Sequence, residues 1–510
     1  MTLHIAATMH TGASPEENHP VLSRQATKDS RHTLLLSAGL ATVILTLAIL
    51  NMCVRNLPWH LDDYDQSKQA YVSFEMVERG DWFLQHTPRQ GIATKPPLMG
   101  WISAGLYYLT HWWEISWRIP SLVSALVLLF LLKREGDKRF AVPVGILVAA
   151  VFALNLLAPR VATLVRTDMM LTLAIFIPGW IIWRKILSRT EWTTAERWAI
   201  FASVLAGVLT KGPVLYAFLL PGVIAFLFLD KENRKYVWCG WWPWVIPLAV
   251  FLVWVGANIA NQEFYDQVVK KEFMGRFTSG EKAVHRSQPV YYYILHLTTR
   301  CAPWSLLLLV LLAKKQTRVW LRANSGTLWL LCWAFAALLF MSIIPSKRTD
   351  RIFPIIPPLS LALGAMCAMW IERGAHWGKW SAAKWFTAVI WLALVTSLGY
   401  TAANMYDQYR QPTDATARFG ENVRAHAAPG KLRIAATPEG HEATLLYLRI
   451  PEFTPLSKAI RDLSHGDVDL LVLSRKEYDH AADKDKWEVL ETLDVTESKD
   501  TYVCVKRKGT

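Results

Sequence analysis

Residues 32–54 read HTLLLSAGLATVILTLAILNMCV, and the stretch HLDDYDQSKQAYVSFEMVERGDW follows at 60–82. The first stretch is an apolar run of about 20 residues, which is long enough to cross a hydrocarbon core of roughly 30 Å as a helix. The second stretch places three aspartates, Asp62, Asp63 and Asp65, directly behind that run. This order predicts a membrane span that ends in a carboxylate cluster where the bilayer meets water.

The composition is that of a polytopic membrane protein. Of the 510 residues, 53% are hydrophobic and only 19% are charged, a balance too apolar for a soluble protein of this length. Similar apolar runs recur, for example GTLWLLCWAFAALLFMSII at 326–344. The six cysteines are scattered without CxxC spacing, so they predict neither a thiolate metal site nor a disulfide framework.

The basic residues predict how the chain threads the membrane. The formal net charge of +14 is concentrated in short clusters between apolar runs, as in the cytoplasmic loops of membrane proteins, so we expect no nucleic-acid partner. Threading the chain between these clusters predicts about eleven spans, or up to about thirteen if two long segments split. The predicted ranges are 33–53, 117–133, 140–157, 168–186, 197–210, 213–229, 241–258, 292–312, 326–344, 352–371 and 385–403.

The threading also predicts the domain organisation. A cytoplasmic tail at 1–32 precedes an uncleaved first span, because the apolar run lacks a small-residue cleavage site. The transmembrane domain covers 33–403, and its first outer loop, 54–116, contains an apolar segment that we interpret as an interfacial helix, 96–113. Strand-like runs alternate with polar helical stretches over 404–510, which predicts a small extracytoplasmic α/β domain, interpreted as a cap or alternatively as an acceptor-binding unit.

Charged residues beside helix-ending signals gather on the predicted outer side. Any one of them could be an ordinary solvated residue, because a charge at the interface is cheap compared with one at the bilayer centre. Together they could stabilise a departing phosphate and accept the proton of an attacking hydroxyl. The carboxylates are Asp62, Asp63, Asp65 and Asp168, and the cations are Lys95, Arg166, Lys211, Lys347, Arg348 and Arg351.

A divalent cation is a further possibility in this set. His86 and the aspartates of the first outer loop offer mixed nitrogen and oxygen ligands. No His or Cys residues follow a metal-ligand spacing, so the sequence leaves the metal open.

An ordered series of motifs resembles the GT-C membrane glycosyltransferases, and within them the branch that contains protein O-mannosyltransferases and the bacterial aminoarabinose transferase of lipid A. The resemblance covers about residues 33–370, and its motifs are DQSKQAYVSFEMVERGDW (65–82), KPPLMGW (95–101), RTDMMLTL (166–173), LTKGP (209–213) and SKRTDRIFPIIPPLSLALG (346–364). The resemblance implies a GT-C fold and a polyprenyl-phosphate sugar donor of the undecaprenyl type. It also implies inversion at the anomeric carbon and an aspartate base in the first outer loop.

The same resemblance assigns expected roles to individual residues. The family motif aligns without a gap on Asp65, which makes Asp65 the expected base, while Gln66 stands where the family has Glu. Thr94 stands where the lipid A branch has a Glu associated with metal binding, which weakens the expectation of a metal. Asp168 is a second catalytic candidate, and Lys95 is expected near the donor phosphate.

The remaining predicted site residues fall into two groups. Arg166, Lys211, Lys347, Arg348 and Arg351 are expected to bind the donor phosphate. The substrate cavity is expected to include Asp62, Asp63, His86, His285, Gln288 and Tyr292, with His285 and Gln288 in a long outer loop that by resemblance closes over the donor.

The predicted function is transfer of a sugar from the lipid-linked donor to an acceptor hydroxyl or phosphate. The acceptor could be lipid A, another glycolipid, a polysaccharide or a protein, and membrane lipids surround the spans. We expect a multi-pass protein of a bacterial inner membrane with its active site facing the periplasm. A transporter or flippase of a lipid-linked sugar is the alternative, although the sequence has no clear internal repeat; a non-catalytic scaffold is a third possibility.

Overall fold

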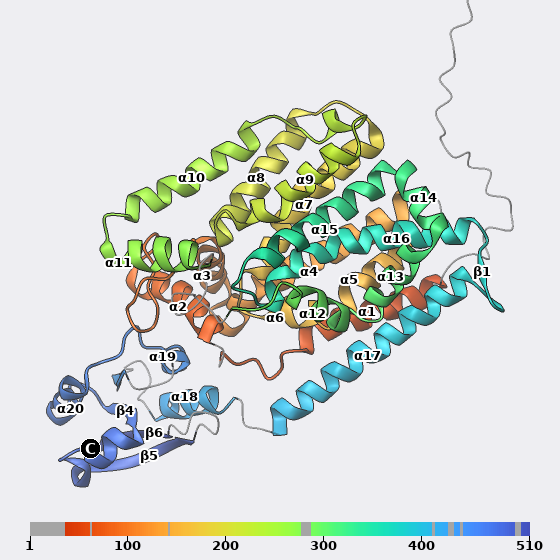
Figure 1. Ribbon diagram of the computed structural model, residues 1–510. Coiled ribbons are helices and arrows are strands. Elements are labelled where there is room, and N and C mark those ends of the chain that lie inside the picture. The colour runs from red at the N-terminus through yellow and green to blue at the C-terminus, as the bar shows by residue number, and fades with distance from the viewer. Residues whose placement is uncertain are drawn as a thin grey trace, which may run out of the picture.

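The computed structural model describes residues 36–61, 64–140, 143–276, 287–410, 414–426, 433–438, 442–494 and 501–509. Apolar helices make up most of the chain, and a small sheet lies near the C-terminus (Figure 1). The apolar helices are α1 (Ala38–Val54), α4 (Trp113–Lys138), α5 (Gly145–Ala153), α7 (Asp168–Ser188), α8 (Thr194–Lys211), α9 (Val214–Leu229), α10 (Trp242–Asn258), α12 (Tyr292–Arg300), α13 (Trp304–Ala313), α15 (Ser325–Ile343), α16 (Ile356–Glu372) and α17 (Ala382–Arg410).

Shorter elements connect these helices. The helical ones are α2 (Tyr64–Arg79), α3 (Leu98–Thr110), α6 (Ala158–Thr163), η2 (Arg234–Tyr236), α11 (Gln262–Phe264), the π-helix η3 (Tyr265–Phe273), η4 (Met274–Arg276), α14 (Lys315–Ala323) and η5 (Thr349–Ile355). A two-stranded hairpin, β1 (His376–Trp377) and β2 (Trp380–Ser381), precedes α17.

The protein is a multi-pass membrane protein by the length and composition of its helices. Among the described residues, five helical segments can cross a membrane: α4, α7, α15, α17 and the continuous η5–α16 segment. The pair α12 and α13, bent by 108°, would make a sixth, and α1, α9 and α10 are apolar but shorter. Each range predicted as a span overlaps one of the apolar helices.

One predicted span is half as long in the structure as the sequence suggested. Among the described residues of 140–157, only α5 is helical, because the buried Asn155 ends that helix and begins the next. Its amide nitrogen donates to Val151 O (3.1 Å) and Phe152 O (2.7 Å), while its Oδ1 accepts from the backbone of Leu157 and Ala158. These bonds satisfy the backbone groups that helix ends leave unpaired, and the chain turns into α6.

The membrane helices pack at close distance around Trp333 of α15. A Cβ atom on Gly179 of α7 would lie 2.4 Å from the Trp333 ring, and one on Gly222 of α9 would lie 2.5 Å from Trp333 Cα. Only glycine therefore allows α7 and α9 to reach α15. The large apolar core that contains Trp333 runs through α4, α5, α7, α9, α15 and α16.

The predicted interfacial segment 96–113 forms α3 and the start of α4. With 13 residues, α3 is about 20 Å long and too short to cross a bilayer. It packs on α2, where Gly100 of α3 faces Val72 and Met76. Tyr108, Leu109 and Trp112 at its C-terminal end are exposed.

The C-terminal part contains a four-stranded mixed sheet in the order β3-β4-β6-β5. The strands β3 (Ile434–Ala436) and β4 (Leu470–Ser474) are parallel, and the remaining pairs, with β5 (Trp487–Asp494) and β6 (Thr501–Arg507), are antiparallel. Its helices are α18 (Ala415–Ala425), α19 (Glu442–Leu448), α20 (Leu456–His465), α21 (Arg475–His480) and the turn η6 (Lys484–Lys486).

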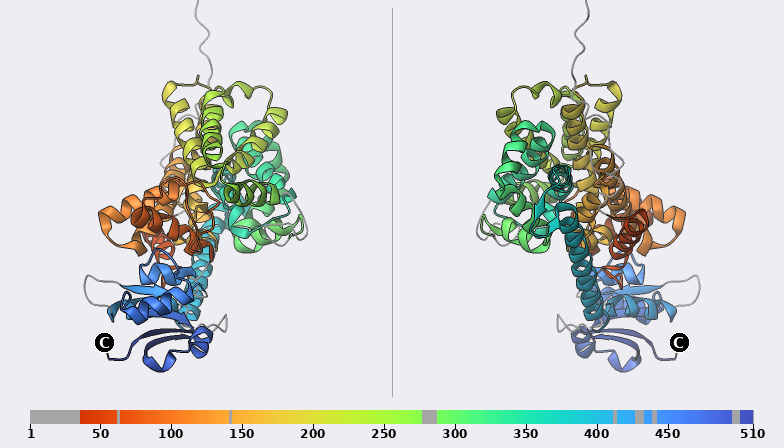
Figure 2. Two further views of the ribbon diagram at one scale, coloured as in Figure 1. Left: turned by 90° about the vertical axis from the view of Figure 1, so that its left-hand side faces the viewer. Right: turned by 90° about the vertical axis from the view of Figure 1, so that its right-hand side faces the viewer.

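This C-terminal part packs against the first predicted outer loop. Figures 1 and 2 show the sheet at one end of the helical part, on the side where α2 and α19 lie. The backbone of Leu61 donates to Tyr447 Oη (2.7 Å), and Tyr71 Oη donates to Pro451 O (2.5 Å). Residues of both regions share one apolar cluster, so α2 is held between the membrane helices and the sheet.

Candidate active site

One face of α2 opens onto a polar cavity of about 280 Å³. Asp65, Lys68, Gln69 and Val72 all line it, and their spacing of three, four and seven residues puts them on one side of a helix. Asp65 lies in the first turn of α2, where the helix dipole favours a carboxylate. The face of α2 that lines the cavity therefore carries Asp65 at its N-terminal end, followed by Lys68 and Gln69.

The cavity unites chain segments that are far apart in the sequence. They are the loop before α3, the turn before α7, the end of α8, the π-helix η3 and the start of η5. Seven cationic side chains and four carboxylates line it: Lys68, Lys95, Arg166, Lys211, Lys271, Arg348 and Arg351, and Asp65, Asp168, Glu272 and Asp350. The excess of cations makes the cavity suited to an anionic ligand such as a phosphate.

The carboxylate of Asp65 is surrounded by cations. It forms an ion pair with Arg348, and its Oδ2 lies 3.9 Å from Nη2 of Arg166. Burial alone would raise the pKa of Asp65, but the charges of Lys95, Arg348 and Arg166 lower it below the usual range of an aspartate. Asp65 is therefore a carboxylate at neutral pH; its side chain is 28% exposed and lines the cavity.

Asp350 holds the second arginine of the cavity in place. Its side chain is 7% exposed and pairs with Arg166 Nη1 at 2.8 Å and with Arg160 Nη1 at 3.3 Å. Arg166 is itself only 4% exposed, so it needs a partner charge to remain buried. Asp350 thus positions Arg166 beside Asp65 and links it to Arg160 on α6.

Asp168 and Lys211 form another ion pair at the cavity wall. Asp168 is the first residue of α7 and Lys211 is the last of α8, so each charge complements the dipole of its own helix. Gly212 follows with a positive φ of 72° and ends α8, where glycine adopts this conformation without strain. The two residues that the sequence predicted in separate motifs are therefore direct partners.

Lys95 lies on the loop that leads into α3. Burial lowers the pKa of its ammonium group, while the charge of Asp65 acts in the opposite direction. Lys95, Arg166, Asp168, Lys211, Arg348 and Arg351 were all predicted from the sequence, and the structure brings them into one cavity with Asp65.

Other predicted residues lie beside the cavity and do not line it. Lys347 donates to the backbone oxygen of Gln288 at 3.0 Å, and Tyr292 Oη lies 3.1 Å from Thr349 Oγ1. These contacts connect the start of α12 to the segment that carries Arg348 and Arg351. The predicted residues Asp62, Asp63 and His285 lie outside the described residues.

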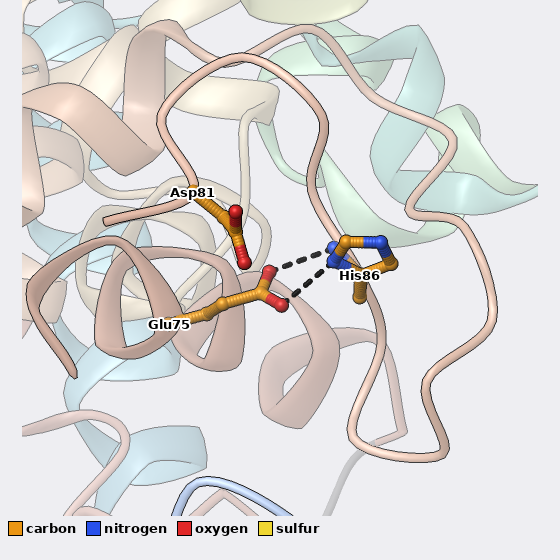
Figure 3. Close-up of side chains that lie close together, drawn as sticks. All are labelled: Glu75, Asp81 and His86. Atoms are coloured by element: carbon orange, nitrogen blue, oxygen red, sulfur yellow. Dashed lines mark hydrogen bonds and ion pairs between the residues drawn. The ribbon is translucent and has the colours of Figure 1, made fainter. Parts of the chain in front are cut away.

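His86 belongs to a separate cluster with Glu75 and Asp81 (Figure 3). Both oxygens of the buried Glu75 carboxylate accept hydrogen bonds from His86, from its backbone N at 2.8 Å and from Nδ1 at 2.7 Å. The side-chain hydrogen bond that His86 makes to the Glu75 carboxylate raises the pKa of His86. These bonds fasten the loop after α2 to the helix. Among the described residues, Glu75, Asp81 and His86 are the group whose ligand atoms lie close enough together to hold a metal ion.

Several lining residues were missed by the sequence reasoning. Lys68 follows Asp65 by three residues, so helical spacing alone could have placed it on the same face. Asp350 lies inside the motif SKRTDRIFP but was not singled out. Lys271 and Glu272 reach the cavity from η3, and no local signal in the sequence points to that contact.

Comparison with solved structures defines the class of fold. The structure superposes on ArnT from Cupriavidus metallidurans, solved with bound undecaprenyl phosphate, with a TM-score of 0.67 at 19% identity, covering 92% of this chain and 98% of that one. Its apo form gives 0.65 at 17% identity, covering 91% and 98%. The oligosaccharyltransferase of Archaeoglobus fulgidus gives 0.50 at 12% identity, covering 87% and 70%. The fold is that of the polytopic GT-C membrane glycosyltransferases, as the sequence motifs predicted.

The family follows from the sequence of the central part of the chain. Residues 162–426 match the model of the Alg9-like mannosyltransferase family, and the chain belongs to this family. Among similar curated proteins are undecaprenyl phosphate-alpha-4-amino-4-deoxy-L-arabinose arabinosyl transferases. The protein from Erwinia tasmaniensis is 27% identical over 308 residues, 59% of this chain and 54% of that protein. The one from Pectobacterium atrosepticum is 28% identical over 342 residues, which are 64% of this chain and 58% of that protein. The chain thus spans little more than half the length of these relatives.

Proposed function

We propose that the protein is an inverting glycosyltransferase that moves a sugar from a polyprenyl-phosphate donor of the undecaprenyl type to an acceptor outside the cytoplasm. The observation that carries this proposal is the ionised Asp65 in a cavity where cations outnumber carboxylates. A phosphate ester and a nucleophile can meet there beside one proton acceptor.

The reaction is a single displacement at the anomeric carbon of the donor sugar. The acceptor oxygen forms a bond to this carbon while the bond from the carbon to the phosphate oxygen breaks. Polyprenyl phosphate leaves with the electron pair, and Lys95, Arg166 and Arg348 stabilise its added negative charge. The proton of an acceptor hydroxyl passes to the carboxylate of Asp65. An acceptor phosphate would need no such proton transfer.

Arg348 has two possible anionic partners in this reaction. In the structure it pairs with Asp65, and a donor phosphate would compete for the same guanidinium. As Arg348 turns to the phosphate, Asp65 loses one stabilising charge and becomes a stronger base. Donor binding and activation of the base would then be coupled through one side chain.

An apolar cavity supports a lipid-linked donor. This cavity of about 150 Å³ lies among α12, α13, α15 and α16, and its lining is almost entirely aliphatic and aromatic. The segment η5–α16 contributes Arg351 to the polar cavity and Ile355 and Ile356 to the apolar one. A phosphate at the first and a prenyl chain at the second would therefore be separated by about one helical turn.

The relatives guide the choice of acceptor and location. Those named above are aminoarabinosyl transferases of bacteria, which supports an inner-membrane protein with a periplasmic active site and a glycolipid such as lipid A as acceptor. The family and fold favour sugar transfer over the transporter alternative. Uptake of a lipid-linked sugar by vesicles without any transfer would reverse this preference.

The test replaces the base without changing its size. In Asp65→Asn we expect sugar transfer to an acceptor hydroxyl to fall by at least about a thousandfold, because the amide cannot accept the proton. Binding of polyprenyl phosphate to the purified protein should persist. The matched control is Asp479→Asn, at an exposed aspartate of α21 that pairs with Arg475, which should transfer at the wild-type rate. Wild-type turnover in Asp65→Asn would remove Asp65 as the base.

A further inference from the structure

A second polar pocket, which we call the arginine pocket, lies on the other side of α2's first turn. Its volume is about 330 Å³, and it is formed by the end of α1, the start of α2, α4, α6, the end of α12 and α17. The lining residues are Arg55, Asn56, His60, Gln66, Arg118, Arg160, Thr163, Leu164, Arg300, Tyr400, Asn404 and Gln408. Tyr400, Asn404 and Gln408 recur every four residues, so α17 presents one polar stripe to this pocket.

The charge of the arginine pocket is one-sided. Four arginines line it, and none of its described lining residues is a carboxylate. Arg118 pairs with Glu114 at 2.6 Å and Arg160 with Asp350 at 3.3 Å. The other two arginines, Arg55 and Arg300, form no ion pair within the described ranges.

Arg55 is buried, and not all of its N–H groups have hydrogen-bond partners. Its residue is 3% exposed, its guanidinium lies 4.9 Å from the centre of the Tyr400 ring, and its Nε has no hydrogen-bond partner. The amide nitrogen of Asn404 is likewise buried without a partner. Burial lowers the pKa of Arg55; Tyr400 acts in the opposite direction, and Arg160 and Arg300 lower it further. Unpaired donors and uncompensated positive charge are costly when buried, and both point to an acceptor-rich anion.

Gln66 is a neutral side chain among the described lining residues of the pocket. Its Oε1 accepts a hydrogen bond from the backbone of Val165 at 3.1 Å, a bond that a glutamate could make equally well. Glu stands at this position in the GT-C motif that residues 65–82 resemble, and Gln66 makes the backbone hydrogen bond without a charge. Among the described lining residues, the four arginines therefore face an amide at position 66 and no carboxylate.

We propose that the arginine pocket binds a phosphate group, at a site separate from the donor cavity. Guanidinium groups match phosphate oxygens as paired donors, and Asn404 adds an amide donor. The pocket lies where α1 ends and α17 carries its polar stripe, so the phosphate of a lipid headgroup and free phosphate share the same access. Arg160 lines this pocket and pairs with Asp350 of the donor cavity, so one ion-pair network borders both sites. The proposal does not require that the protein transfers sugar.

The test measures phosphate binding to the full-length protein in detergent by calorimetric titration with sodium phosphate. Arg55→Gln and Gln66→Glu should each weaken binding by at least about tenfold. Gln66→Glu is the sharper variant, because it preserves the Val165 hydrogen bond and adds only a charge. Arg184→Gln is the matched control, since this exposed arginine of α7 lies over Trp180 and is not part of the pocket.

A third variant separates the two anion sites. Lys95→Gln alters only the donor cavity, so phosphate affinity at the arginine pocket should stay within about twofold of wild type. If Lys95→Gln abolishes binding while Arg55→Gln and Gln66→Glu bind as wild type, phosphate occupies the donor cavity alone and the proposal is overturned. Thermal unfolding of each variant confirms that the protein is folded. Wild-type sugar transfer in Asp65→Asn would refute the proposed base but would leave this result untouched.

A second titration identifies the source of the phosphate. Dihexanoyl phosphatidic acid carries the same phosphate on a short lipid. Binding at least about tenfold tighter than inorganic phosphate, and lost in Gln66→Glu, would assign the pocket to a lipid headgroup. Equal affinities would assign it to free phosphate. Absence of binding by either probe would overturn the proposal.

Discussion

Replacing Asp350 tests whether one buried carboxylate holds the cationic wall of the donor cavity together. Asp350 pairs with Arg166 at 2.8 Å and with Arg160 at 3.3 Å, and both Asp350 and Arg166 are less than a tenth exposed. In Asp350→Asn the shape and one acceptor oxygen remain, but the charge is lost. Arg166 would then lose its 2.8 Å carboxylate partner while remaining buried near Asp65.

The size of the effect follows from these distances. At 2.8 Å the attraction between Asp350 and Arg166 is about 6 kcal/mol with an effective dielectric of about 20. Arg160 is 34% exposed, so solvent screens much of its contribution. Removing the charge also relieves the cost of burying the carboxylate, which leaves a net loss of about 3 kcal/mol, at the low end for breaking a buried ion pair.

Thermal unfolding in detergent measures this loss. We expect the Tm of Asp350→Asn to fall by about 3 °C, and the transfer rate to fall by on the order of tenfold as Arg166 turns toward Asp65. Asp479→Asn breaks an exposed pair with Arg475 and should change stability by less than about 0.5 kcal/mol. If both variants unfold at the wild-type temperature, the buried network does not stabilise the cavity and the reasoning is refuted.

Two further predictions concern protonation. Burial raises the pKa of Asp65, but the charges of Lys95 and Arg348 hold it low. In Arg348→Gln this pKa should rise, so the acid limb of the kcat/KM profile against pH should move to higher pH. If the limb does not move, Asp65 is not the group whose titration produces it. Glu75 raises the pKa of His86 through a hydrogen bond, and stability from a raised pKa is present below the unfolded value and lost as pH rises through the folded one. The Tm difference between wild type and Glu75→Gln should therefore be larger near pH ~6 than near pH ~9. Equal differences would mean that His86 does not gain charge through this contact.

Much of the membrane part could be predicted from local patterns. The length of each apolar run and the placement of basic clusters located the helices, because the bilayer imposes the same requirement on every span. The prediction failed in detail at α5, where the buried Asn155 ends the helix early through four hydrogen bonds. An asparagine within an apolar run gives no such signal by itself, since its partners are fixed only by the fold.

In the candidate site, the sequence identified individual residues, but only the fold showed which of them are in contact. Motif order singled out Asp65, Lys95, Arg166 and Arg348 one by one. Their convergence depends on helix packing, since Arg348 and Asp65 are 283 residues apart. Asp350 stands two residues from Arg348, yet its role as a partner of two arginines appears only when α6, α7 and η5 are brought together.

The sequence by itself determined that the chain is a polytopic membrane protein of the GT-C type, because hydrophobic length, charge bias and motif order are properties of the linear chain. The tertiary structure alone decided which charges neutralise one another and which remain available. It paired Lys211 with Asp168 and His86 with Glu75, and it placed Gln66 in a lining of four arginines. The physical reason is that electrostatic interactions depend on distance and burial in space, and neither quantity is contained in the spacing of residues along the chain.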